Sequence, residues 1–359
     1  MASGCRRVAR FIVIVAVLAV VLLAGAGFWG WQRYQAFADR PLQGLGEDAT
    51  LEVARGDSFA GVLRKLRAQG VSDGHDLEWR TLARRTGTDA QLKVGEYALP
   101  QGITPRRLMD DMRQGRVIHY RFTLVEGWNI RQLRAALRAA TPLRQETAEL
   151  DDAALMAALG HPGQHPEGRF LPETYLYSRS DSDRDVLARA HAAMEKALAE
   201  AWDARAPDVP LQSAEQALIL ASIIEKETGI AGERPAIAGV FARRLRIGMP
   251  LQTDPTVIYG IGSSYDGNIR RRDLTTDTPY NTYTRRGLTP TPIAMPGRDA
   301  LRAAVNPQDG DALYFVAVGD GSGRHVFSAT LAEHNAAVAR YLATRRRTLQ
   351  ARETEPATP

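Results

Sequence analysis

Ser213-Ala-Glu-Gln-Ala-Leu-Ile-Leu-Ala-Ser-Ile-Ile-Glu-Lys-Glu-Thr-Gly229 is the most informative stretch of this 359-residue chain, and its pattern predicts a helix. Ser213 and Gln216 have the spacing of a capping box, and Gly229 provides a C-terminal stop. The apolar side chains at helical spacing form one stripe, which consists of Ile219, Leu220, Ile223 and Ile224. The helix therefore has a face suited to a hydrophobic core.

Glu225 follows this stripe directly and lies in the last turn of the predicted helix. The negative end of the helix dipole and the nearby Glu227 both disfavour an anion there, and burial would add to this effect. A carboxylic acid that stays partly protonated near neutral pH is what a general acid for glycosidic cleavage requires. The alternative is a surface glutamate that pairs with Lys226 or with an arginine one turn away.

Glu227 is the rival candidate for the same role. It lies two positions further on, about 200° around the helix, so the two carboxylates do not easily serve one pocket. Glu225 adjoins Ile224 at the edge of the apolar stripe. We therefore expect Glu225 to be the catalytic residue.

The N-terminal segment predicts a membrane anchor. Phe11–Trp31 is a run of 21 residues without a charged side chain, which is long enough to cross a bilayer as a helix. Three arginines precede it, and the positive-inside rule then places residues 1–10 in the cytoplasm and sends the rest across the membrane. A cleaved signal peptide is the alternative, because Ala24-Gly25-Ala26 resembles a cleavage site.

The charge and the cysteine content exclude several classes of protein. The formal net charge is +5, but removing the three arginines before the anchor leaves 43 basic residues against 41 acidic ones. This balance is not that of a nucleic-acid-binding surface. Cys5 is the only cysteine, so there is no internal disulfide, and it precedes the apolar run, where it cannot be a lipoprotein acceptor.

The exported portion mixes helices with short strands and is long enough for two domains, so we expect an α+β fold. Residues 32–48 are polar and are expected to be a linker, and residues 49–117 are expected to be a small α/β unit. Its predicted elements are the strands Thr50–Ala54 and Gly95–Leu99, a helix capped by Asp57 or Ser58 that ends near Ala68, and the helices Asp76–Thr86 and Pro105–Arg113.

Residues 118–347 are expected to form a larger mixed domain. Near its end, Leu313–Val318 and His325–Ser328 flank a glycine-rich turn and predict a hairpin, and a helix from about Thr330 to Arg347 closes the domain. The tail, residues 348–359, is expected to be disordered.

Gly248–Pro296 is a long, turn-rich segment of this domain. A loop of such length inside a regular domain is usually functional or disordered, and its aliphatic and aromatic residues argue against disorder. Its amide, hydroxyl and aromatic side chains suit sugar hydroxyls and N-acetyl groups. The candidate substrate-binding residues are Gln252, Thr253, Asp254, Asn281, Tyr283 and Thr284. His325 and His334 lack a third ligand at metal spacing, so we expect neither a metal site nor a cofactor.

Four strings resemble the endolytic murein transglycosylase (YceG-like) family: Ala221–Thr228, Arg243–Gly260, Tyr280–Thr284 and Gly287–Ile293. The resemblance extends in order through Gly56-Asp57-Ser58, Phe170–Tyr175 and His334-Asn335, from about residue 10 to residue 345. Long strings in the same order are highly specific.

The resemblance implies that the first glutamate of the Ile-Glu-Lys-Glu motif, here Glu225, is catalytic. It implies that residues 49–117 form a LysM-like subdomain, a type of module that binds N-acetylhexosamine polymers. In this unit the Gly-Asp-Ser turn and Tyr97 are candidate contacts for an N-acetyl sugar. It also implies a single-pass inner-membrane enzyme whose catalytic domain faces the periplasm. Its partners would be peptidoglycan strands and the membrane, with peptidoglycan synthases as further candidates.

Such an enzyme would cut the MurNAc–GlcNAc bond within nascent strands, leave 1,6-anhydroMurNAc ends and so terminate strand elongation. One carboxyl group suffices, because the C6 hydroxyl of the muramic acid replaces water. Glu225 would protonate the glycosidic oxygen and then accept the proton of that hydroxyl. Two alternatives stay open: a non-catalytic peptidoglycan-binding scaffold, and a muramidase-type hydrolase with Asp254 or Glu173 as its second carboxylate.

Overall fold

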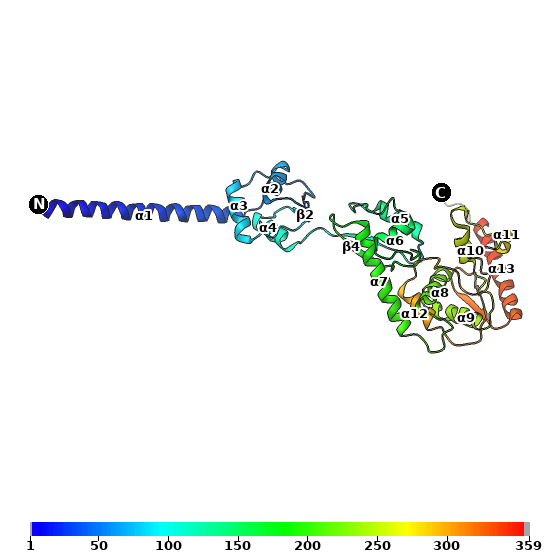
Figure 1. Cartoon of the computed structure of the whole chain (residues 1–359). Helices are drawn as coiled ribbons and strands as arrows, with labels where there is room; N and C mark the ends of the chain where they lie inside the picture. The colour runs from blue at the N-terminus through cyan, green and yellow to red at the C-terminus, as the bar shows by residue number, and fades with distance from the viewer. Residues whose placement is uncertain (1, 355–359) are drawn as a thin grey trace. The chain divides into compact units, whose positions relative to one another are not determined.

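The computed structural model describes residues 2–354, with side chains described from Arg10 to Arg347. Helices and short strands are mixed along the chain, which confirms the α+β class (Figure 1). The chain divides into two compact units. The first runs through Tyr120 and includes Tyr177–Ser180, and the second contains Arg121–Leu176 and the chain from Asp181 onward.

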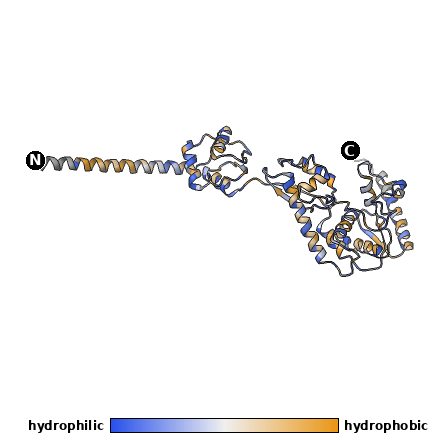
Figure 2. Cartoon of the chain, viewed as in Figure 1, coloured by the Kyte–Doolittle hydropathy of each residue, from blue (hydrophilic) through white to orange (hydrophobic). Residues whose placement is uncertain are grey.

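The helix α1 (Ala2–Asp39) contains the apolar N-terminal segment, as Figure 2 shows. Within the described residues, Arg10–Asp39 is the one helical stretch long enough and apolar enough to cross a membrane, and its most apolar part has no protein packed around it. A signal sequence has the same properties. The helix continues to Asp39, so the first half of the linker expected at residues 32–48 is helical instead. The reason is packing, because the Phe37 ring meets the edge of the Trp79 ring at 5.2 Å.

The first unit is built around a two-stranded antiparallel ribbon. β1 (Thr50–Val53) pairs with β2 (Gly95–Ala98), and Leu51 lies opposite Tyr97. The helices that cover this ribbon are α2 (Phe59–Ala68), α3 (Asp76–Thr86) and α4 (Pro105–Gln114). The Ser58 hydroxyl caps α2 by accepting a hydrogen bond from the Gly61 N–H at 3.2 Å, which confirms the predicted start of that helix.

The second unit is assembled around α8 (Ala214–Glu227), which packs against α7, α9, α10 and α12. Every residue from Ala217 to Glu225 is buried, so the helix is covered on all sides rather than along one stripe. Ser213 caps the helix by accepting a hydrogen bond from the Gln216 N–H at 3.3 Å. The other helices of this unit that precede α13 are α5 (Ile130–Ala139), α6 (Asp152–Ala158), α7 (Asp183–Asp203), α9 (Arg234–Arg246), α10 (Asp254–Ile261), α11 (Arg271–Thr275) and α12 (Arg298–Val305).

The remaining strands and the last helix belong to the second unit, apart from Tyr120 and Tyr177 at the ends of β3 and β4, which belong to the first. β3 (Tyr120–Thr123) pairs with β4 (Thr174–Tyr177), and β5 (Tyr314–Ala317) pairs with β6 (His325–Ser328) as the predicted hairpin. α13 (Leu331–Thr354) packs against that hairpin and extends beyond the expected end at Arg347. The start of the expected disordered tail is therefore helical, and its end, residues 355–359, lies outside the described residues.

Candidate active site

The Glu225 carboxylate lies at the C-terminal end of α8 and is buried. It accepts a hydrogen bond from Nη2 of Arg234 at 2.9 Å and a second one from the backbone N–H of Gly297, also at 2.9 Å. Lys226, the partner expected for a surface glutamate, turns away and donates to the carbonyl oxygen of Gly127 at 3.2 Å. Glu225 is thus a buried residue that is paired with the Arg234 cation.

A further carboxylate, Glu126, shares the same arginine. Nη2 of Arg234 lies 3.2 Å from the Glu126 carboxylate, whose side chain is about half exposed. Partial burial and the negative charge of Glu225 raise the pKa of Glu126. Glu126 can lie this close to the backbone of residue 297 only because that residue is glycine, since a Cβ there would overlap the Glu126 carboxylate. In the sequence, Glu126 is recognisable only as part of a Glu-Gly turn, and Arg234 has no distinguishing pattern.

Glu227 is the last residue of α8, and its surroundings differ from those of Glu225. It accepts a hydrogen bond from the Thr253 hydroxyl and lies beside the Asp254 carboxylate. The residue is partly exposed, but protein atoms surround its carboxyl group. This burial, reinforced by the negative charge of Asp254, raises the pKa of Glu227 to about 7.

Four of the six candidate substrate-binding residues lie at or beside the contacts of Glu227. Thr253 is the residue before α10 and donates to Glu227, and Asp254 accepts a hydrogen bond of 2.6 Å from the Tyr283 hydroxyl. Gln252 precedes them with an exposed side chain and a positive φ of 51°, an unfavourable backbone conformation for a residue other than glycine. Strained residues of this kind concentrate at functional sites.

The other two candidates stabilise the loop. Asn281 is 1% exposed, and its side-chain amide donates to three backbone carbonyls between Asp273 and Thr276. Its buried side chain is therefore occupied by the loop and is not available to a sugar. Thr284 is exposed and donates to the Asp277 carboxylate at 2.8 Å. Some of the amide and hydroxyl groups recognised in the sequence therefore hold the loop together, whereas others lie near Glu227. The sequence does not distinguish these two roles.

The carboxylates considered for a hydrolase are held in different places. Glu173 pairs with Arg298 at 2.9 Å on the surface, whereas Asp254 lies at Glu227. A third carboxyl group, that of Glu167, is fully buried beside the N-terminus of α5. Both its oxygens accept a hydrogen bond from the Ile130 N–H, and burial raises the pKa of Glu167 to about 7.

In the first unit, Tyr97 was expected to contact a sugar, and the structure contradicts this expectation. Tyr97 is 1% exposed, and its hydroxyl donates to the Lys93 carbonyl oxygen at 2.7 Å. Burial raises the pKa of Tyr97 to about 12. Because the ring is part of the core, it cannot stack on a sugar.

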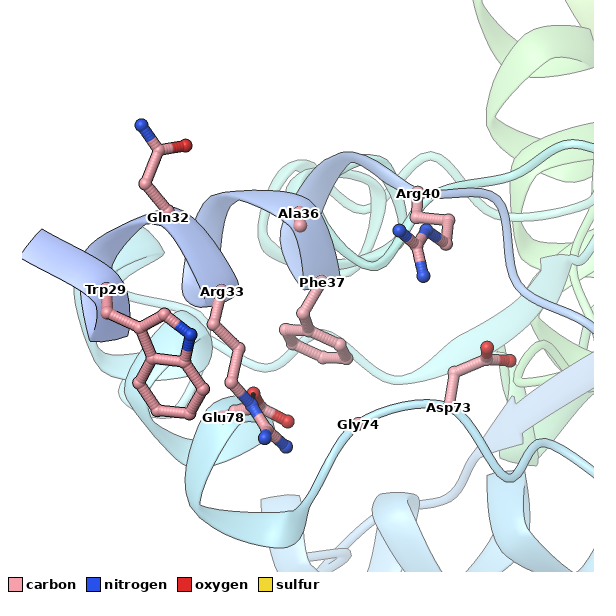
Figure 3. Close-up of a pocket in the computed structure, with 9 residues that line it drawn as sticks. All are labelled: Trp29, Gln32, Arg33, Ala36, Phe37, Arg40, Asp73, Gly74 and Glu78. Atoms are coloured by element: carbon pink, nitrogen blue, oxygen red, sulfur yellow. Dashed lines mark hydrogen bonds and ion pairs between the residues drawn. The ribbon is translucent and has the colours of Figure 1, made fainter.

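A groove of about 620 Å³ is present elsewhere in the first unit, between the end of α1 and the segment that leads into α3. Figure 3 shows Arg33 reaching from α1 toward Glu78, with the Trp29 and Phe37 rings on either side; the Arg33–Glu78 ion pair measures 2.9 Å. Aromatic rings beside charged groups suit a polar ligand with an apolar face.

Comparison with known proteins places the chain in a family. A model of the YceG-like family matches residues 51–340. A Bacillus subtilis protein named endolytic murein transglycosylase is 33% identical over 270 residues, which cover 70% of this chain and 74% of the relative.

A Streptococcus pneumoniae protein of the same name is 25% identical over 340 residues, which cover 85% of this chain and 60% of that longer relative. The crystal structure of a putative yceG-like protein from Listeria monocytogenes matches with a TM-score of 0.52 and 28% identity, covering 81% of this chain and 98% of that one.

Proposed function

Because the chain belongs to the YceG-like family, we propose that it is a membrane-anchored endolytic peptidoglycan transglycosylase that cuts the MurNAc–GlcNAc bond within nascent glycan strands. Relatives named endolytic murein transglycosylase support this reaction class. Within the chain, the supporting observation is the setting of the Glu227 carboxyl group at the end of α8. Protein atoms surround this group, it accepts a hydrogen bond from the Thr253 hydroxyl and lies beside Asp254, and burial raises its pKa, which suits a group that donates and then accepts a proton.

The general acid in this proposal is Glu227, and Glu225, the residue expected from the sequence, is the alternative. The two donors to Glu225, the Arg234 guanidinium and the Gly297 N–H, both stabilise a negative charge. Glu227 accepts a hydrogen bond from the neutral hydroxyl of Thr253 and lies beside the negative charge of Asp254. This negative charge favours the protonated form of Glu227. Both glutamates lie in the last turn of α8, as the sequence argument required, and they differ in these partners.

The proposed reaction needs one carboxyl group that acts twice. Glu227 donates its proton to the glycosidic oxygen as the bond from that oxygen to C1 of the muramic acid breaks. The substrate's N-acetyl group stabilises the positive charge that develops at C1. The C6 oxygen then bonds to C1, its proton passes to the Glu227 carboxylate, and a 1,6-anhydro ring results with no water consumed.

The neighbours of Glu227 have positioning roles in this scheme. The Thr253 hydroxyl orients the carboxyl group from the N-terminus of α10, and Thr253 is itself held by its N–H, which donates to the Thr282 hydroxyl at 3.0 Å. Tyr283 holds Asp254 in place through its 2.6 Å hydrogen bond. The exposed Gln252 side chain is the candidate that is free to contact the sugar.

The location and the role of the first unit are part of the same proposal. The charge-free apolar run in α1, preceded by arginines, supports a single-pass anchor in the inner membrane with the catalytic unit in the periplasm. The LysM-like role of residues 49–117 is to hold glycan near the catalytic unit, which raises its local concentration. N-terminal sequencing of the mature protein separates an anchor, which keeps the first residues, from a signal peptide cleaved after Ala26.

Glu227→Gln and Glu225→Gln form a matched pair that tests the proposal. We expect Glu227→Gln to lower cleavage of purified glycan strands by about 10²–10⁴-fold with unchanged thermal unfolding, because the amide cannot donate the proton. Glu225→Gln should retain most of the activity, and wild-type cleavage should decline as the pH rises through about 7. If Glu225→Gln loses the activity and Glu227→Gln retains it, then Glu225 is the general acid.

Mass spectrometry of the products decides the reaction class. Internal cleavage that yields 1,6-anhydro ends supports the transglycosylase. Products with reducing ends would instead identify a hydrolase in which Asp254 is the second carboxylate. Intact strands that remain bound to the folded protein would identify a scaffold.

A further inference from the structure

Two histidines and a glutamate meet at one edge of α7, within the second unit. His191 and Glu195 lie one turn apart on this helix, and His161 follows the end of α6. Their potential ligand atoms all lie within 4.8 Å of one another. The sequence does not reveal this group, because thirty positions separate the two histidines and neither lies in a recognisable metal-binding motif.

The two histidine rings are stacked, and each has a ring nitrogen close to the Glu195 carboxylate. The two imidazoles lie against each other with centroids 3.9 Å apart and an angle of 29° between their planes. Nδ1 of His191 lies 3.6 Å from one Glu195 oxygen, and Nδ1 of His161 lies 3.9 Å from the other. These separations are longer than hydrogen bonds, so the three groups face one another without bonding directly.

Gln164 fixes the proton on the buried histidine. Its side-chain oxygen lies 2.8 Å from Nε2 of His191 and can only accept, so the ring carries its hydrogen there. Nδ1 of His191 then presents its lone pair toward His161 and Glu195. A polar group that orients a histidine through its other nitrogen is the usual outer partner of a metal ligand.

A tetrahedral ion requires shorter separations than those observed. Zn²⁺ binds histidine nitrogen at about 2.0–2.1 Å, so two ligand atoms of a tetrahedral site are about 3.4 Å apart. His191 Nδ1 lies 3.6 Å from one oxygen of Glu195 and His161 Nδ1 lies 3.9 Å from the other, so the side chains must rotate to bring a single oxygen to both nitrogens. The His161 and Glu195 side chains are 34% and 55% exposed, which leaves them room to close around an ion.

We propose that His161, His191 and Glu195 bind a divalent transition-metal ion of the Zn²⁺ class. Two imidazoles and one carboxylate suit Zn²⁺ better than Mg²⁺ or Ca²⁺, which prefer oxygen ligands. The ion fastens α7 to the turn after α6, and it also steadies Phe170, whose ring meets the edge of the His191 ring at 6.0 Å. Its role is structural and independent of the cleavage reaction.

The test uses the full-length protein in detergent, free of any histidine tag and stripped of metal with a chelator. Calorimetric titration with ZnCl₂ should give one bound ion per chain that is lost in His161→Ala and Glu195→Gln. Free Zn²⁺ at about a hundred times its dissociation constant should raise the unfolding midpoint by about 5–10 °C. MgCl₂ should produce no shift.

The controls make either outcome decisive. His119→Ala removes an exposed histidine of the first unit and should bind Zn²⁺ as the wild type does. Glu195→Gln changes an exposed side chain without altering its size, so loss of binding there cannot be attributed to unfolding. Absence of Zn²⁺ binding in the wild type, or binding retained at full affinity in both His161→Ala and Glu195→Gln, would overturn the proposal.

Discussion

Arg234→Met removes the cation that lies between two carboxylates, and we expect it to destabilise the second unit strongly. The Arg234 side chain is 7% exposed and that of Glu225 is 4% exposed, so neither group can be solvated by water when its partner is lost. Breaking a buried ion pair by removing one partner costs about 3–5 kcal/mol. At about 2–4 °C per kcal/mol for a domain of this size, the unfolding midpoint should fall by about 6–20 °C.

Glu225→Gln breaks the same pair from the other side and should cost less. The amide oxygen can still accept the Arg234 hydrogen bond, and the guanidinium keeps Glu126 at 3.2 Å. Weakening a hydrogen bond between charged groups costs about 1.5–3 kcal/mol. The double variant, Arg234→Met with Glu225→Gln, has no buried charge at this place and should therefore be more stable than Arg234→Met alone.

Thermal unfolding of the full-length protein and its three variants, followed by circular dichroism, measures this cycle. A non-additive result, with the double variant recovering part of the loss, indicates direct coupling between the two residues. If Arg234→Met unfolds within about 2 °C of the wild type, the assigned role of the ion pair is wrong. Losses that simply add in the double variant would contradict it as well.

Two further predictions follow from buried groups. The folded pKa of Glu167, about 7, lies above its ordinary value of 4.5, so the folded state binds the proton more tightly and its stabilising effect is lost as the pH rises from about 4.5 to 7. The unfolding midpoint of Glu167→Gln should therefore depend less on pH in that window, and an unchanged slope would show that Glu167 does not titrate there. Tyr97→Phe loses the hydrogen bond to the Lys93 carbonyl and should cost about 1 kcal/mol, measured by denaturant unfolding, with retention on insoluble peptidoglycan unaltered. Reduced retention at unchanged stability would restore Tyr97 as a sugar contact.

Local patterns in the sequence were sufficient for the parts of the fold that depend on neighbouring residues. Ser58 and Ser213 cap the helices that they were expected to start, and the β5–β6 hairpin lies where two short segments flank a glycine-rich turn. Caps, turns and periodicity involve residues a few positions apart. They are therefore readable without knowledge of the tertiary structure, as is the apolar run in α1.

The electrostatics at the end of α8 depended on contacts that no local pattern contains. The helix dipole and mutual repulsion act on Glu225 and Glu227 alike. The sequence separated them by their position relative to the apolar stripe and by the resemblance to the family motif, and neither describes their surroundings. The tertiary structure brings Arg234 and Gly297 to Glu225, and Thr253 and Asp254 to Glu227. Desolvation and ion pairing are set by these long-range neighbours. The sequence therefore identified the helix on which the candidate acid lies, whereas the folded chain determines which partners surround each of its two glutamates.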